Sequence, residues 1–394
     1  MAQGQHFLQI PGPSPVPERV QRAIDRQVID HRGPEFQKLA QQVLADIRPI
    51  FGTTQPVIIY PSSGTGAWEA AIVNTLSPGD KVLMAETGQF ATLWRALAAR
   101  WGINVDFLPG DWRHGVDAAA IEAKLAEDTS HAIRAVMVVH NETSTGCLSD
   151  IAAVRKAIDA ARHPALLMVD TISSLGSAPV RHDAWGSDVT VSGSQKGLML
   201  PPGLSFTAVS QKALAAAKTN KLPRSYWDWQ EMISFNAKGF FPYTPATTLL
   251  FGLRESLAML NEEGLENVFA RHQRLAAACR AAVRGWGLEV LCLDPNVYSP
   301  ILTGVVMPAG HDADQFRKVA LEHFNISYGA GLGKVAGKVF RIGHLGDCNE
   351  LTLMAALCAT EMGLKLSGVP HKAGGVAAAM ASFTQEGSSL RLTA

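Results

Sequence analysis

Hydrophobic and polar positions alternate in two different ways along the chain. Between residues 56 and 210, short apolar runs rich in β-branched residues alternate with helix-length amphipathic segments. This pattern is typical of a mostly parallel sheet covered by helices on both faces. It predicts seven strands, at residues 57–60, 81–85, 105–108, 135–140, 166–170, 188–192 and 204–209. Helices are expected at residues 65–76, 90–101, 117–126 and 151–161.

The second half of the chain starts with a helix-rich stretch, residues 244–286, in which Leu249, Leu253, Leu257 and Leu260 recur at helical spacing. Further strands are expected at 288–293, 303–307, 326–328 and 339–342, and helices at 313–324 and 350–364. A final helix with a frayed end is expected from residue 373. The pattern predicts an α/β fold with an N-terminal arm (1–20), a large domain on a seven-stranded sheet (21–265) and a smaller α+β domain (266–394).

Composition narrows the classes of function. The chain has 394 residues, 47% of them hydrophobic, and its 35 Lys and Arg residues balance 35 Asp and Glu residues. That length and apolar content suit two folded domains and exclude disorder as the main state. A net charge of zero gives no basic field for nucleic acid. No apolar stretch approaches the roughly 20 residues of a membrane span. We therefore expect neither nucleic acid nor a membrane as a partner.

Five scattered cysteines, none spaced as C-x-x-C, indicate reduced thiols rather than a disulfide framework or a zinc cluster. The histidines show no metal-ligand spacing, so no metal site is expected. The N-terminal residues lack a basic-then-apolar signal pattern. The expected compartment is the cytoplasm.

The most informative residues follow two predicted strands. Lys196 lies just after the apolar run 188–192, and burial would lower its pKa toward the neutral amine that forms Schiff bases. Asp170 ends the apolar strand 166–170. Alone, the lysine could simply reach solvent and the aspartate could cap a helix. Together they suit a cofactor with an aldehyde for the amine and a protonated ring nitrogen for the acid.

Three further segments carry candidate chemistry. The turn Ser63-Gly64-Thr65-Gly66 opens a helix, whose free N–H groups suit a phosphate, although such turns are also common structural features. Phe90 follows a strand and could stack on a flat ring or belong to the core. Arg341, inside an apolar strand, could bind a substrate carboxylate or form an internal salt bridge. The glycine-rich string 329–337 is interpreted as a flexible loop near the mouth of the site.

These segments resemble a known family, the class V (fold type I) aminotransferases that depend on pyridoxal 5′-phosphate, and within it the alanine–glyoxylate and serine–glyoxylate group. The most specific block is Ser192-Gly193-Ser194-Gln195-Lys196 with Pro201-Pro202-Gly203 after it. The resemblance covers nearly the whole chain. Its other segments are Ile10-Pro11-Gly12-Pro13, Asp30-His31-Arg32-Gly33-Pro34, Ser63-Gly64-Thr65-Gly66, His140-Asn141-Glu142-Thr143-Ser144-Thr145-Gly146, Val169-Asp170, Tyr243-Thr244-Pro245, Leu253-Arg254-Glu255-Ser256-Leu257 and Arg341-Ile342-Gly343-His344-Leu345-Gly346.

The resemblance implies a role for each candidate residue. Lys196 would form the Schiff base with pyridoxal 5′-phosphate, and Asp170 would bind the pyridine nitrogen. Arg341 would hold the substrate carboxylate. The remaining cofactor contacts would be Ser63, Gly64, Thr65 and Gln195 at the phosphate, Phe90 against the ring and Thr143 near the 3′-oxygen. Thr244 would reach the phosphate of the neighbouring subunit, which implies a homodimer with shared active sites. Where relatives often have a tyrosine three residues before that threonine, this chain has Phe241, so that hydroxyl contact is in doubt.

The function implied is transfer of an amino group from a small L-amino acid to glyoxylate. Phe90, Trp94 and Tyr243 are expected to crowd larger side chains, which favours small donors such as serine or alanine. Serine is the first choice, because the segments 30–34 and 243–245 most resemble the serine–glyoxylate subgroup. Alanine or aspartate as donor, and pyruvate as acceptor, stay open; aspartate would need a second cation such as Arg32 of the partner chain. A desulfurase would need a reactive cysteine, and Cys348 shows no sign of one. A non-catalytic dimeric binding protein with this fold is a further alternative, against which the retained lysine, aspartate, arginine and phosphate turn argue.

Overall fold

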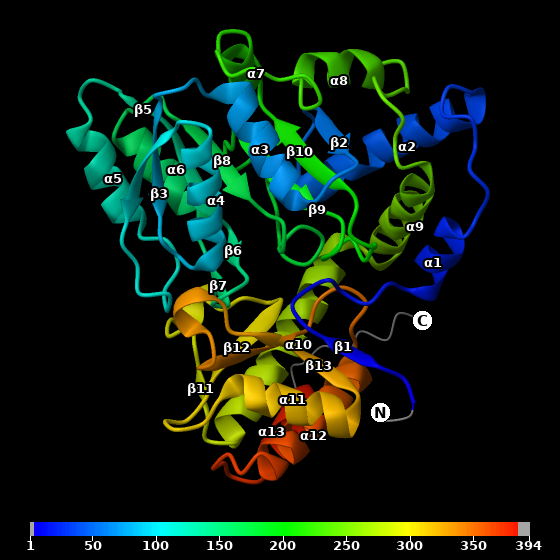
Figure 1. Ribbon diagram of the computed structural model, residues 1–394, viewed down its shortest axis with the longest axis vertical. Helices are drawn as coiled ribbons and strands as arrows, with labels where there is room; N and C mark the ends of the chain where they lie inside the picture. Colours follow the sequence, from blue (N-terminus) through cyan, green and yellow to red (C-terminus); the bar gives the residue numbers. More distant parts are fainter. Residues whose placement is uncertain (1–3, 385–394) are drawn as a thin grey trace.

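Two sheets organise the computed structural model, which describes residues 4–384 and has a larger and a smaller lobe (Figure 1). The strands of the larger sheet are β2 (Val57–Tyr60), β3 (Lys81–Ala85), β4 (Asn104–Leu108), β5 (Ile133–Val139), β8 (Leu166–Asp170), β9 (Val189–Gly193) and β10 (Ser205–Val209). Their order is β2-β10-β9-β8-β5-β3-β4. All neighbours are parallel except β10, which runs antiparallel to β2 and β9. This confirms the predicted seven-stranded, mostly parallel sheet.

Helices cover both faces of this sheet because its strands bury both of their faces. In β5, Met137 and Val139 belong to a core with α3 and α4, while Val136 and Val138 point to a second core with α5 and α6. Alternate residues of a strand face opposite sides, so each face needs its own helical cover. The helices of this lobe are α1 (Glu18–Ile24), α2 (Pro34–Phe51), α3 (Gly64–Thr75), α4 (Gln89–Arg100), α5 (Ala118–Glu127), α6 (Ile151–Ala160), α7 (Gln211–Ala217), α8 (Trp229–Asn236) and α9 (Thr247–Glu263).

The smaller lobe has a five-stranded sheet of its own. Its strands are β1 (Phe7–Gln9), β11 (Glu289–Val290), β12 (Leu302–Val306), β13 (Ile326–Ala330) and β14 (Val339–Gly343), in the order β1-β13-β14-β12-β11. Its helices are α10 (Leu265–Gly285), α11 (Ala313–Phe324), α12 (Glu350–Leu366) and α13 (Gly375–Thr384). Short elements elsewhere are the hairpin β6 (Asn141–Glu142) and β7 (Cys147–Leu148), and the 3-10 turns η1 (Pro295–Val297) and η2 (Gly333–Val335).

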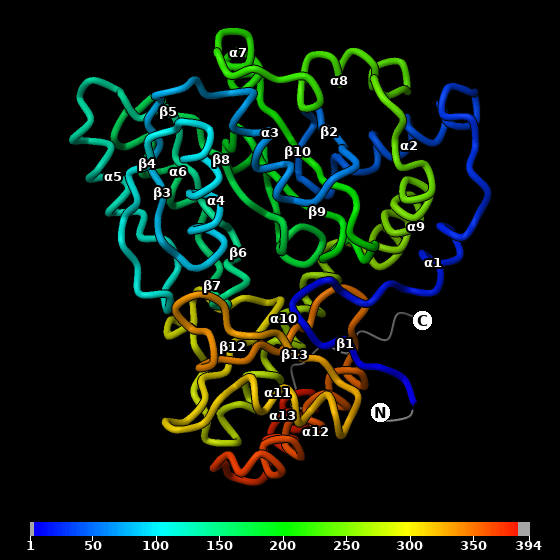
Figure 2. Tube along the Cα trace, viewed as in Figure 1, coloured from blue at the N-terminus to red at the C-terminus, as the bar shows by residue number. Residues whose placement is uncertain are grey.

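The N-terminal segment links the two lobes. Its strand β1 pairs in parallel with β13, so the segment contributes to the small sheet before the chain enters the large lobe at α1 (Figure 2). The core residues change from one lobe to the other between Val268 and Leu275, within α10. The predicted division at residues 20 and 265 stays an interpretation. The predicted frayed end of the last helix lies outside the described residues.

None of the helices within residues 4–384 combines the length and apolar character needed to cross a membrane. All five cysteines are free, and only Cys358 is exposed.

Candidate active site

The predicted site residues converge where the parallel strands end. Asp170 closes β8, and Lys196 lies just beyond the neighbouring strand β9. A cavity of about 130 Å³ opens between them. It is lined by Ser63, Gly64, Thr65, Trp68, Phe90, Asn141, Thr143, Asp170, Ile172, Ser173, Gln195 and Lys196. Every predicted site residue except Thr244 and Arg341 therefore faces one cavity, at the edge where parallel-sheet proteins place ligands.

Lys196 is almost completely buried and has one hydrogen-bond partner for its amine. Its Nζ donates to the carbonyl oxygen of Pro11 at 2.6 Å. Burial and, to a smaller extent, the Arg341 cation lower the pKa of Lys196 to about 8 against the opposing effect of Asp170. A substantial fraction of the amine is therefore neutral near physiological pH, as a nucleophile and proton carrier requires.

The N-terminal segment forms the wall against which Lys196 lies. Gly12 has φ +101°, and a Cβ there would lie 2.3 Å from Lys196 Nζ. Ser14 secures the lysine loop, because its N–H donates to the Gln195 carbonyl at 3.0 Å and its Oγ donates to the Lys196 carbonyl at 2.8 Å. Gly12 belongs to one of the segments that resemble the family, Ile10-Pro11-Gly12-Pro13, but the resemblance implied no role for it. Its signal is a glycine beside prolines, far from the lysine in sequence.

Asp170 is buried and forms no ion pair within residues 4–384. Its Oδ1 accepts from the Ile172 N–H at 2.7 Å, and its Oδ2 accepts from Trp68 Nε1 at 3.1 Å. Burial raises the pKa of Asp170 to about 7, the Ile172 hydrogen bond opposes this, and the nearby Glu142 adds to it. A carboxyl group in this state gains most from a cation delivered into the cavity, such as a protonated ring nitrogen. Sequence reasoning missed Trp68, whose position in a helix carried no distinguishing signal.

The start of α3 forms an anion cradle. Ser63 occupies the N-cap position without a side-chain capping hydrogen bond, so its hydroxyl does not cap the N–H groups of the first turn, although the Gly66 N–H donates to the Ser63 carbonyl at 2.9 Å. A Cβ on Gly64 would lie 2.5 Å from Ile172 Cδ1, so only glycine allows this close approach. Gln195 Oε1 is buried without a partner among the described residues, and a half-turn of that amide presents its NH₂ group instead. These donors and this geometry fit a phosphate group.

Glu142 follows β5 and holds two neighbouring parts of the site in place, the start of α4 and Ser144. Its buried carboxylate accepts from the N–H groups of Phe90 at 3.3 Å and Ala91 at 3.1 Å, which start α4. It also accepts from Ser144 Oγ at 2.6 Å. The neighbouring Asn141 donates through Nδ2 to Ser173 Oγ at 2.9 Å, while its Oδ1 faces no protein partner in residues 4–384. Neither Glu142 nor Asn141 was predicted as a site residue.

Arg341 comes to the site from the small lobe, on β14. Its Nε donates to the Ala330 carbonyl and its NH1 to the Thr143 carbonyl, each at 2.7 Å. Burial lowers the pKa of Arg341 to about 10, with Glu142 opposing the shift, so it remains cationic at neutral pH. No ion pair involves Arg341 within the described part of the chain, so the internal salt bridge is not the arrangement found. A cation next to the cavity with a free NH2 group fits a substrate carboxylate.

Three predicted contributions do not reach the cavity in this chain. Thr244 is exposed ahead of α9, so its contact with a neighbouring subunit stays a prediction. Phe241 packs edge-on against Phe36, with ring centroids 6.0 Å apart. The expectation that Trp94 and Tyr243 crowd the donor is wrong for this chain, because neither lines the cavity. Trp94 is fully buried against Trp68, and Tyr243 stacks on Tyr226 at 4.4 Å.

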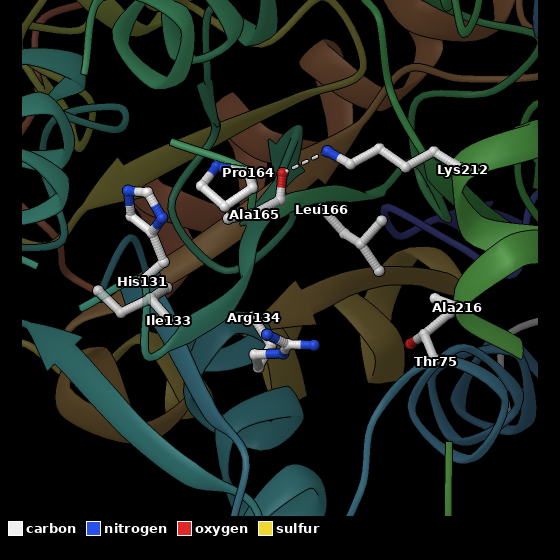
Figure 3. Close-up of a pocket in the computed structure, with 9 residues that line it drawn as sticks. All are labelled: Thr75, His131, Ile133, Arg134, Pro164, Ala165, Leu166, Lys212 and Ala216. Atoms are coloured by element: carbon white, nitrogen blue, oxygen red, sulfur yellow. Dashed lines mark hydrogen bonds between the residues drawn. The ribbon is translucent and has the colours of Figure 1, made fainter. Parts of the chain in front are cut away.

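A second hollow, of about 190 Å³, lies at the other end of the strands, near the starts of β5 and β8 (Figure 3). Its lining includes Arg134, His131 and Lys212. Lys212 donates to the Ala165 carbonyl at 2.8 Å and lies 3.5 Å from Asp188. It contains no residue of the motifs described above and lies at the amino edge of the sheet, so it is not the candidate active site.

Comparison with known proteins gives one consistent family. A family model described as Aminotransferase class-V matches residues 6–337. The serine–glyoxylate aminotransferase of Methylorubrum extorquens is 49% identical over 389 residues, covering 97% of each chain. The L-aspartate–glyoxylate aminotransferase of Paracoccus denitrificans is 46% identical over 383 residues, also covering 97% of each. The crystal structure of pyridoxamine-pyruvate aminotransferase from Mesorhizobium loti superposes with a TM-score of 0.90 at 29% identity, covering 96% of both chains.

Proposed function

The chain belongs to the class V aminotransferase family, and from this premise we propose that it transfers an amino group from serine to glyoxylate with pyridoxal 5′-phosphate as its cofactor. One observation carries the proposal. A buried amine and a buried acid that forms no ion pair within the described residues face the same cavity from neighbouring strand ends, beside a helix start without a side-chain cap. A binding protein would need the cradle but not the amine.

The residues of the cavity fit the cofactor. Ser63, Gly64, Thr65 and Gln195 would hold its phosphate, Phe90 would lie against its ring, Thr143 would contact it near the 3′-oxygen, and Lys196 would be joined to it covalently. When bound, pyridoxal 5′-phosphate supplies an aldehyde that receives amino groups and a conjugated ring that accepts electrons from the substrate Cα.

Three residues of the chain then take part in the amino transfer. Lys196 would take the proton from Cα of the amino donor and deliver it to the aldehyde carbon of the cofactor, and would move a proton the opposite way when the oxoacid is aminated; its pKa of about 8 allows this near neutral pH. Asp170 keeps the proton on the ring nitrogen. Arg341 binds the carboxylate that amino donor and oxoacid have in common, so both substrates adopt one orientation.

Serine as donor and glyoxylate as acceptor rest on the curated relatives, several of which are named serine–glyoxylate aminotransferases. Aspartate is the main alternative donor, supported by the relative from Paracoccus denitrificans. Arg32 is exposed and forms no ion pair within residues 4–384, so Arg32 of one subunit would be available to bind the distal carboxylate of aspartate in the site of the other subunit. Alanine as donor and pyruvate as acceptor remain within the same chemistry.

A panel of amino donors tests this proposal. Serine, alanine and aspartate are each assayed with glyoxylate and with pyruvate, using protein supplied with pyridoxal 5′-phosphate, and Lys196→Ala serves as the control. We expect the highest kcat/KM for serine with glyoxylate and no transfer by Lys196→Ala. A higher value for aspartate would overturn serine as the donor. No transfer with any donor would instead favour the non-catalytic binding protein.

The desulfurase alternative has little support in the geometry. Cys348 is buried, burial raises the pKa of its thiol, and it does not line the cavity. A mobile thiolate is what that reaction needs. Incubation with cysteine is therefore expected to release no sulfide.

We further propose that the protein forms a homodimer and lies in the cytoplasm. Exposure of Thr244 next to α9 is consistent with a contact to a second subunit. Free cysteines are consistent with a reducing compartment.

A further inference from the structure

The glycine-rich loop between β13 and β14 reaches from the small lobe to the large one. Its backbone packs directly on the large lobe at Gly333, which has φ +51°. A Cβ at Gly333 would lie 2.2 Å from Gln89 Oε1 and 2.8 Å from Trp112 Cη2. The loop expected from the sequence to be flexible is therefore packed against the start of α4.

An ion pair joins the lobes at the same place. Lys334 Nζ donates to Glu86 Oε1, and the same oxygen accepts from Trp112 Nε1 at 2.9 Å. The Lys334 ammonium lies 5.4 Å from the centre of the Trp112 ring, and Trp112 is only 3% exposed. Partial burial would raise the pKa of Glu86, but Lys334 and Trp112 hold it below its usual range. Glu86 is thus a charged acceptor at neutral pH, and its side chain is only 14% exposed.

The loop connects this ion pair to Arg341. Ala330, four residues before Lys334, accepts the hydrogen bond from Arg341 Nε at 2.7 Å. The other end of the guanidinium is held by the Thr143 carbonyl of the large lobe. Arg341 therefore donates to two carbonyl groups, one in each lobe. Ala330 is the last residue of β13, where it pairs with Phe340 of β14, and the ion pair fixes the loop that begins directly after it.

We propose that Lys334 and Glu86 are positioning residues that clamp residues 330–337 onto the large lobe and so hold the Arg341 guanidinium in place for the carboxylates of donor and acceptor. The inference rests on the proposed function. It assigns the two residues no contact with substrate or cofactor; they act through Ala330 and Arg341.

The test compares Lys334→Met with Lys334→Arg in the full-length enzyme supplied with pyridoxal 5′-phosphate. For Lys334→Met we expect KM to rise about 2-fold to 5-fold for both donor and glyoxylate, as for loss of an ion pair with one exposed partner, with kcat within about 2-fold of wild type. Lys334→Arg keeps the charge and should restore KM. Hydrogen exchange in peptides covering residues 330–338, measured without substrate, should be faster in Lys334→Met only.

A matched control lies in the same lobe. Lys318 on α11 is 64% exposed, against 60% for Lys334, and lies 4.0 Å from Glu322. Lys318→Met should leave both KM values and the exchange unchanged. An active wild type with unchanged KM values in Lys334→Met, or an equal rise in Lys318→Met, would overturn this inference alone. A wild type that transfers no amino group would overturn the proposed function and the inference with it.

Discussion

Burial shifts the pKa values of Asp170 and Lys196 in opposite directions, and each shift favours the neutral form of the group. It raises the pKa of the acid to about 7 and lowers that of the amine to about 8. Each group affects the pKa of the other, but burial in this cavity makes the charged form of each one unfavourable. A cofactor with a cationic ring nitrogen would give Asp170 the partner that the protein does not provide.

Asp170→Asn should stabilise the cofactor-free protein at pH 8 and yet lower its amino-transfer activity. Because the folded pKa of Asp170 lies above its ordinary value of 3.8, ionisation costs stability as pH rises above about 4, and the full cost is present above about 7. A shift of about 3 pKa units corresponds to at most about 4 kcal/mol. Cofactor-free Asp170→Asn should therefore be more stable than wild type at pH 8 and equally stable at pH 4. Amino transfer should fall by about 100-fold or more, because an amide does not retain the ring proton.

Asp183 provides a control of opposite sign for the unfolding measurement. Its partial burial would raise the pKa, but hydrogen bonds from Thr53 and Thr54 hold it below the usual range. Its stabilising contribution is present above the unfolded pKa and is lost as pH falls through the lower folded pKa. Asp183→Asn should therefore lose stability at pH 8. Urea titrations that show Asp170→Asn also destabilised at pH 8 would contradict the assigned environment of Asp170.

The residues predicted from sequence are those whose chemistry is unusual for their position, such as a lysine or an arginine next to an apolar strand. Trp68 and Glu142 were not predictable in this way. Trp68 reaches Asp170 across 102 positions of sequence, and Glu142 caps a helix 51 positions earlier. Such partners become visible only when the strands are placed side by side.

At the scale of elements, the N-terminal segment has two structural roles. Strand β1 adds to the small sheet, and the residues after it form a wall of the cavity in the large lobe. The wall touches Lys196 through backbone atoms, so a glycine is required at the closest approach.

Gly12→Ala should displace Lys196 and reduce activity by about 10-fold or more, because the new Cβ would overlap the Lys196 amine. Gly79→Ala is the matched control. Gly79 has φ +87°, similar backbone strain to Gly12 at +101°, but nothing within 4 Å of an added Cβ. Both variants should lose about 1 kcal/mol of stability from the strained backbone, and only Gly12→Ala should lose kcat. Equal activity of the two variants would show that the segment does not position the lysine.

The apolar strands were predictable as elements because each is a short buried run between polar turns. The predicted strands at 57–60, 81–85 and 166–170 match β2, β3 and β8 in full. The helices α1, α2, α7 and α8 were not predicted. They lie outside the regular strand–helix alternation, although α2 carries apolar residues at helical spacing, such as Phe36 and Leu39, a proline at its start (Pro34) and a left-handed glycine at its end (Gly52).

At the scale of the whole molecule, the site depends on two lobes and, we propose, on two subunits. Arg341 comes from the small sheet and Lys196 from the large one, so the arrangement of the lobes sets the spacing between substrate carboxylate and amine. Thr244 is exposed and does not line the cavity of its own chain. The sequence predicted the seven strands of the large sheet and four strands of the small one, but not β1, whose pairing with β13 joins residues far apart in the chain, as does the relative placement of the two sheets.

Complementation between variants tests the shared site. In a dimer with shared sites, a Lys196→Ala chain paired with a Thr244→Ala chain forms one doubly altered site and one intact site. Thr244→Ala alone should weaken cofactor binding about 10-fold or more, through loss of a hydrogen bond to a charged phosphate. At a cofactor concentration that leaves this variant largely empty, the co-expressed mixture should regain activity. Activity no higher than the sum of the two separate variants would contradict a shared site.

The most direct measurement is to locate the bond between protein and cofactor. Full-length protein loaded with pyridoxal 5′-phosphate is reduced with borohydride, digested and analysed by mass spectrometry, with Lys196→Ala treated in parallel. The account predicts a stable cofactor adduct on Lys196 and none in the variant. An adduct on a different lysine, or unmodified Lys196 in protein saturated with cofactor, would contradict it.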